Sequence, residues 1–122
     1  MELIQLADRI EALKGPDREV DSLVAVALGF ATAIHPTKPE RCAWHDSGGL
    51  FIASPTFTES MDAAMTTIPH GCITSLARQQ RFRKPEWTWG LNDGRGVTHF
   101  GTGASAAIAI VSTSLRALAV GE

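Results

Sequence analysis

Apolar side chains recur at every third or fourth position near the start of the chain, with charged and polar residues between them. The apolar positions are Leu3, Leu6, Ala7, Ile10 and Leu13. This spacing predicts an amphipathic helix. After Gly15-Pro16-Asp17, a helix stop followed by a proline suited to a first helical turn, the spacing returns from Val20 to Leu28 and ends at Gly29. We therefore expect a second helix, forming an antiparallel pair or a right-angled corner with the first.

The pattern changes at residues 35–41, which hold two prolines and no apolar side chain and which we interpret as a linker. After this linker the apolar period shortens. Residues 43–45 and 50–52, separated by Asp46-Ser47-Gly48-Gly49, predict a β-hairpin with a glycine-containing turn.

Two more helices are expected further along the chain. Hydroxyl-bearing residues in the segment 58–60 predict the start of a short helix over residues 61–68, which Pro69 ends. The final helix is expected over residues 104–120. Its core-facing stripe consists of Ile108, Val111, Leu115 and Leu118.

The segment between these two helices has the pattern of strands. A strand is expected over residues 72–76, followed by a polar excursion over residues 78–85. Residues 86–91 alternate large apolar with polar or small side chains, as a half-buried strand requires, and place two tryptophans on one face, so we expect at least one of them in the core. A turn at residues 92–94 leads to a last strand over residues 97–100.

The predicted order of elements is α-α-β-β-α-β-β-β-α. The strand connections are short enough for hairpins, which favours an antiparallel sheet. Helices before and after this sheet can cover both of its faces. We therefore predict an α+β fold of the α/β/α sandwich type in a single domain, residues 1–122.

Composition narrows the class of protein without indicating an activity. The 122 residues are 44% apolar and 20% charged, which is ordinary for a globular domain. The formal net charge of −2 provides no overall basic field, so we do not expect a nucleic-acid or membrane partner. The charged start of the chain is unlike a signal peptide, and the two cysteines are too few for a disulfide framework. A soluble, cytoplasmic protein is expected.

Three blocks of sequence resemble a known family. They are Leu6–Ala12 continued by Gly15–Asp21; Thr58-x-Ser60-x-Asp62-Ala63-Ala64-Met65-Thr66-x-x-Pro69-x-Gly71; and the alanine-rich final helix that ends in Leu115-Arg116-Ala117. In this order they are similar to small bacteriophage and prophage proteins of the phage ABA-sandwich type. The resemblance implies a sandwich fold and a phage origin, and it supplies no activity and no catalytic residue. The chain departs from the family pattern at Phe57, His70 and Cys72.

Two cysteines and two histidines form a candidate metal site. Cys42-x-x-His45 and His70-x-Cys72 supply the ligand types and the number of ligands that zinc prefers. Their spacing matches no standard zinc motif, and burial as small apolar residues also accounts for the cysteines. We therefore predict no metal and no other cofactor, and keep these four residues as the alternative.

The start of the final helix is a candidate phosphate site. In Gly101-Thr102-Gly103-Ala104-Ser105, free backbone N–H groups could meet an anion through Thr102, Gly103 and Ser105. The segment lacks the lysine of a P-loop and the spacing of a dinucleotide-binding motif. A strand-to-helix turn with a hydroxyl cap explains the same residues.

A cluster of basic residues is the strongest local charge in the chain. Arg78, Arg81, Arg83 and Lys84 lie within seven residues, and no acid follows until Glu86. Such a cluster can bind phosphates or an acidic protein. A solvated hairpin loop is the alternative interpretation.

Three aspartates are candidate metal carboxylates, although each also has a structural interpretation. Asp17 and Asp62 fit helix N-termini, where negative charge is favourable, and Asp21 fits a solvent-exposed face. No pair of groups has the spacing of a general acid–base or nucleophilic site.

We therefore predict a non-catalytic phage or prophage accessory protein that binds a host protein or a small, phosphate-bearing ligand. The alternatives are an enzyme that uses the Cys/His cluster or the Gly101–Ser105 helix start, and a structural subunit of a phage particle. The sequence leaves the oligomeric state open.

Overall fold

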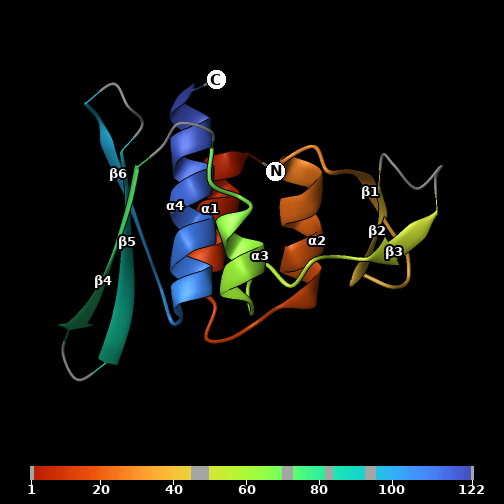
Figure 1. Cartoon of the computed structure of the whole chain (residues 1–122). Helices are drawn as coiled ribbons and strands as arrows, with labels where there is room; N and C mark the ends of the chain where they lie inside the picture. Colours follow the sequence, from red (N-terminus) through yellow and green to blue (C-terminus); the bar gives the residue numbers. More distant parts are fainter. Residues whose placement is uncertain (1, 45–49, 70–72, 82–83, 93–95, 122) are drawn as a thin grey trace.

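The computed structural model describes residues 2–44, 50–69, 73–81, 84–92 and 96–121 (Figure 1). In chain order the elements are α1 (Leu3–Glu11), α2 (Arg18–Ala27), β1 (Ala31–Ile34), β2 (Arg41–Trp44), β3 (Phe51–Ala53), α3 (Met61–Met65), β4 (Ile73–Arg81), β5 (Lys84–Asn92), β6 (Thr98–Gly103) and α4 (Ala106–Gly121). The predicted α+β class and order of elements are confirmed, with β1 as one strand more than the sequence predicted.

The two N-terminal helices lie where the sequence predicts them, except that Pro16 precedes the N-cap of α2 instead of belonging to its first turn. Asp17 caps α2 by accepting a hydrogen bond from the Val20 N–H at 3.1 Å, which confirms its predicted place at a helix N-terminus. Gly29 has a φ of +80° directly after α2, a conformation that favours glycine and turns the chain out of the helix. The chain then enters β1, so the predicted linker is the connection of a β1–β2 hairpin.

The strands form two antiparallel sheets, one of β1-β2-β3 and one of β4-β5-β6. In the second sheet, β4 and β5 pair without interruption from Ile73↔Asn92 to Arg81↔Lys84. The prediction of a polar excursion over residues 78–85 is therefore wrong, because these residues continue the strands except at positions 82–83, which lie outside the described residues. Since β4 is at the edge of its sheet, a polar sequence is compatible with strand structure there.

The layers differ from the predicted sheet between two layers of helices. In Figure 1 the helices form a central layer, with β4-β5-β6 on one side and β1-β2-β3 on the other. Helix α4 contacts α1, α3, β5 and β6, whereas α2 contacts β1 and β2. Hydrophobic spacing predicts which face of an element is buried but not which elements share a sheet, and this explains the difference.

Helix α4 is the centre of the core. Every residue from 106 to 115 is buried, so the burial extends well beyond the predicted stripe. Three consecutive hydroxyl residues lie in this buried stretch. Ser112 and Thr113 donate to the carbonyl of Ala109 and Ser114 donates to that of Ile110, so the helix itself accommodates their hydroxyl groups. Trp89 of β5 also lies in the core, which confirms that at least one tryptophan of its strand is buried.

The helices in the described part of the chain lack the combination of length and hydropathy that a membrane span requires.

Candidate functional site

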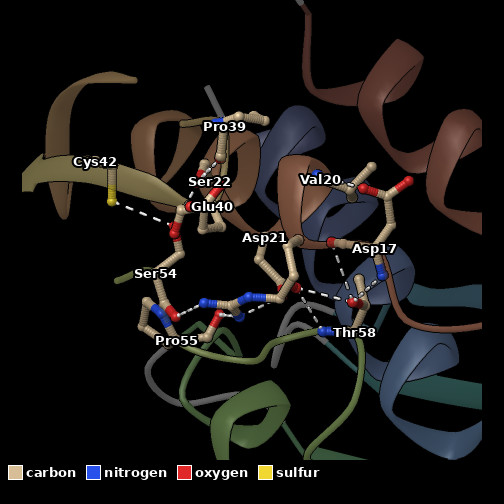
Figure 2. A network of polar contacts seen from close by, with 11 residues as sticks. Asp17, Val20, Asp21, Ser22, Pro39, Glu40, Cys42, Ser54, Pro55 and Thr58 are labelled. Carbon is tan, nitrogen blue, oxygen red and sulfur yellow. Dashed lines mark hydrogen bonds and ion pairs between the residues drawn. The ribbon is translucent and has the colours of Figure 1, made fainter. Parts of the chain in front are cut away.

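A buried carboxylate lies between α2 and the segment that leads to α3. Asp21 is fully buried; its Oδ1 accepts the Thr58 N–H at 2.8 Å and the Thr58 hydroxyl at 2.9 Å, and its Oδ2 accepts Arg18 Nη1 at 2.7 Å (Figure 2). The prediction that Asp21 faces solvent is therefore wrong. Thr58, which binds Asp21 Oδ1, is 37 positions away in sequence, and helical spacing carries no information about it.

The environment of Asp21 acts on its protonation in two opposing ways. Burial raises the pKa of Asp21 above its ordinary value, whereas the hydrogen bonds from Thr58 and the charge of Arg18 act in the opposite direction. Both carboxylate oxygens are engaged by groups of the chain. This arrangement makes the carboxylate a structural link between α2 and the segment before α3.

Arg18 extends the network toward the first sheet. Its Nη2 donates to the Ser54 carbonyl at 2.6 Å and its Nη1 reaches the Pro55 carbonyl at 3.3 Å. The buried Ser54 hydroxyl contacts the Ser22 hydroxyl and lies 3.1 Å from the Glu40 carbonyl (Figure 2). The network therefore fastens the chain after β3 onto α2.

Cys42 of β2 is the last residue of this network, which it joins through Ser54. Its side chain is fully buried and its Sγ lies 3.5 Å from the Ser54 Oγ. The other three residues of the candidate metal site, His45, His70 and Cys72, lie outside the described residues. Within the described ranges, no three His, Cys, Asp or Glu side chains are grouped closely enough to hold a metal ion.

A second polar cluster joins α1, α4 and β6. Arg116 Nη2 donates to Asp8 Oδ1 at 2.6 Å and to Glu11 Oε1 at 2.7 Å, and its Nε donates to Glu11 Oε2 at 3.2 Å. The hydrogen bond to Glu11, assisted by Asp8, raises the pKa of Arg116 above its ordinary value. The same Glu11 Oε2 accepts the backbone N–H of Thr102 at 3.2 Å. One N–H of the candidate phosphate site is thus occupied by a carboxylate of the chain.

The remaining residues of that candidate site also have structural partners. The Ser105 Oγ accepts the Ile108 N–H at 3.3 Å and so caps the start of α4. Gly103 belongs to β6, and a Cβ there would lie 2.9 Å from the Ala109 nitrogen. The glycine therefore allows β6 to pack closely against α4, which accounts for it without a ligand.

The basic residues occupy the end of the β4–β5 hairpin. Arg78 and Arg81 belong to β4 and Lys84 begins β5, whereas Arg83 lies outside the described residues. Arg78 pairs with Trp87, the same residue that pairs with Gly103 at the end of β6. We call the paired residues from Arg78↔Trp87 to Arg81↔Lys84 the hairpin end. Its last pairs extend past the end of β6, and in Figure 1 it projects beyond the helices.

Neither a protein-family model, nor a curated protein, nor a solved structure matches this chain significantly. The resemblance to phage ABA-sandwich proteins therefore stays a prediction.

The sequence blocks that carry this resemblance are the ones that the polar networks join. Asp21 of the first block binds Thr58 of the second. Glu11 of the first block binds Arg116 of the third. The sequence alone did not predict the Asp21–Thr58 contact or the Glu11–Arg116 contact. The signal that could have indicated them is that charged and hydroxyl residues recur in the three blocks. These residues hold the fold together, and their charged groups are engaged within the fold.

Proposed function

We propose that this chain is a small phage or prophage accessory protein that binds an acidic surface of a host protein without catalysing a reaction. The observation that carries the proposal is the position of the basic residues. Arg78, Arg81 and Lys84 are gathered at a projecting end of the second sheet, and the sequence adds the charge of Arg83 between the two strands. The one acid in this range is Glu86, which pairs with Gln79. The excess of positive charge attracts a partner of the opposite sign before contact.

The shape of the hairpin end favours a protein over a small ligand. Small-molecule sites are concave and surround most of the ligand surface. The hairpin end consists of β4 and β5 alone, because their pairing continues past the end of β6. Such a projecting pair of strands is suited to contact with the surface of another protein. In the helix-start candidate, the Thr102 N–H and the Ser105 hydroxyl already have partners in the chain. These contacts support a protein partner rather than a phosphate-bearing ligand.

The polar clusters inside the fold support a binding role as well. Asp21 and Glu11 each accept several hydrogen bonds from neighbouring elements. A carboxylate used in this way contributes to stability and is not available to a substrate.

The test is capture of partners from a bacterial lysate by the immobilised protein. One variant replaces Arg78, Arg81 and Lys84 by Gln. A matched control replaces Lys14, Lys38 and Arg41 by Gln, so both variants lose three positive charges. These three residues are exposed, and they belong to the α1–α2 connection, the β1–β2 connection and β2. We expect the native chain and the control to retain a host protein that the hairpin variant loses.

Salt provides a second criterion for the same experiment. Attraction between exposed charges is screened within about 8 Å at physiological ionic strength, so retention should fall as salt rises. A partner that the hairpin variant still retains at low salt would contradict the proposal. Retention of phage particle proteins in place of host proteins would favour the alternative of a structural subunit.

A further inference from the structure

Strand β4 is an unusually long and regular sheet edge. It has nine residues, and in the order β4-β5-β6 its one neighbour among the described strands is β5. All nine residues pair with β5 in continuous register, without a bulge. Strands of globular proteins typically have about 5–6 residues, so this edge presents a long row of backbone groups.

The edge lacks several features by which proteins prevent strand addition. Such edges are commonly shortened, bulged, interrupted by proline or protected by charged side chains. The sequence of β4, ITSLARQQR, contains no proline, and its charged residues, Arg78 and Arg81, lie in its second half. The edges of the first sheet differ, since β1 shows a register irregularity and β3 has three residues.

The charge of β4 indicates what can occupy it. Arg78 and Arg81 lie in its second half, and β4 contains no acid. Lys84 and Glu86 of β5 pair with Arg81 and Gln79, so the paired strands keep an excess of positive charge at this end. A second copy of this chain would bring charge of the same sign to the edge. An acidic segment brings the opposite charge.

We propose that an extended acidic segment of the partner pairs with β4 and becomes a fourth strand of the second sheet. This inference rests on the proposed function and specifies how the partner is held. Backbone hydrogen bonds to β4 supply affinity, and acidic side chains opposite Arg78 and Arg81 supply selectivity. Since strand residues rise about 3.3 Å each, the two arginine positions are about 10 Å apart along the strand. The segment therefore carries acidic residues three positions apart at one end and uncharged, β-branched residues opposite Ile73–Ala77.

The probe is a nine-residue peptide with Glu at its first and fourth positions and Val or Thr at the others. In an antiparallel arrangement its Glu residues lie opposite Arg81 and Arg78. One control peptide has Gln in place of both Glu residues. A second control keeps both Glu residues and has proline at its centre, which disrupts strand pairing.

The readout is amide hydrogen exchange of the isotope-labelled full chain, followed by NMR with and without peptide. We expect the Glu peptide to slow exchange at alternate residues of β4 by tenfold or more, because alternate N–H groups of an edge strand point away from its neighbour. The Gln peptide is expected to bind at least tenfold more weakly. The proline peptide is expected to leave β4 exchange unchanged.

The failures of the two proposals are distinguishable. If the Glu peptide does not bind, or binds without protecting alternate residues of β4, strand addition is wrong, whereas the lysate experiment decides the proposed function separately. If the chain sediments as a dimer and shows the alternate protection without peptide, a second copy occupies the edge and the proposal is overturned. Protection by the Glu peptide that the Arg78, Arg81 and Lys84 variant loses and the Lys14, Lys38 and Arg41 variant keeps would support it.

Discussion

Asp21 and Thr58 form a double hydrogen bond across 37 positions of sequence: the N–H and the hydroxyl of Thr58 both donate to Asp21 Oδ1, at 2.8 and 2.9 Å. The Thr58 hydroxyl also accepts the Asp17 N–H at 2.9 Å. One hydroxyl group therefore connects the start of α2 with the buried carboxylate one turn later. This connection ties the segment between β3 and α3 to the start of α2.

Replacement of Thr58 by Val tests the energetic weight of this hydroxyl. Val keeps the shape of the side chain but leaves the Asp17 N–H and one lone pair of Asp21 without their partner. We expect a loss of about 1–3 kcal/mol in the free energy of unfolding, measured by urea denaturation. Thr66→Val is the matched control, because the Thr66 hydroxyl lies at an exposed position, and a change within about 0.5 kcal/mol is expected there. Equal effects of the two substitutions would contradict the assigned role of Thr58.

The pKa of Asp21 predicts a particular dependence of stability on pH. Burial raises this pKa in the folded chain above the unfolded value near 4, so the folded chain keeps the proton to higher pH. The contribution of Asp21 to stability is therefore fully present below about pH 4 and decreases as the pH rises through the folded pKa. We expect the free energy of unfolding of the native chain, minus that of Asp21→Asn, to decrease between pH 3 and pH 7. An increase over this range would show that the hydrogen bonds outweigh the cost of burial.

The ion pair between Glu11 and Arg116 should contribute more than an exposed pair. Both side chains are mostly buried, and Glu11 also binds the Thr102 N–H. A double-mutant cycle with Glu11→Gln and Arg116→Gln should give a coupling free energy of about 1–3 kcal/mol in thermal or urea unfolding.

The pair of Arg9 and Glu19 is the control for this cycle. These side chains are about half exposed and 3.9 Å apart, so a coupling below about 0.5 kcal/mol is expected. Similar coupling in the two cycles would mean that the contacts of Arg116 with α1 add little to the fold.

Gly103→Ala tests the close packing of β6 on α4. The added Cβ would lie 2.9 Å from the Ala109 nitrogen, in backbone that cannot move without displacing the helix. We expect a loss of about 1–3 kcal/mol in stability. Gly15→Ala is the control, since a Cβ at Gly15 meets no atom within 4 Å, and its melting temperature should not fall. Retained stability of the Gly103 variant would reopen a ligand role for this glycine.

The position of Cys42 predicts that purified protein carries no stoichiometric zinc. Its sulfur is buried against Ser54, and a thiolate ligand would need to leave this contact. Elemental analysis of the purified chain is the measurement. About one zinc per chain, lost in Cys42→Ala, would overturn the prediction.

The sequence predicts well those features that depend on near neighbours. Amphipathic spacing located α1, α2 and α4, and alternation located the half of β5 around Trp89, because in each case the buried positions repeat within one element. The Asp17 cap was predictable for the same reason. The burial of Asp21 was not, because it depends on Thr58 and Arg18 acting together across the fold.

Strand β4 shows a different limit. Its composition is polar, and composition alone favoured a loop over residues 78–85. The strand forms because each residue pairs with a partner in β5, and an edge strand does not need an apolar face on both sides. For the same reason the sequence located the basic residues and suggested a hairpin loop for them, but it did not predict that Arg78, Arg81 and Lys84 are paired strand residues.

The position of α4 at the centre of the core has a consequence for synthesis. The elements that enclose it, α1, α3, β5 and β6, precede it along the chain and leave the ribosome first. Their apolar faces cannot be covered until residues 106–115 have emerged, so the core completes late and through contacts between distant segments. A nascent chain stopped before Ala106 is therefore expected to remain protease-sensitive and to bind chaperones, whereas release of the α4 segment allows α1, α3, β5 and β6 to pack around it.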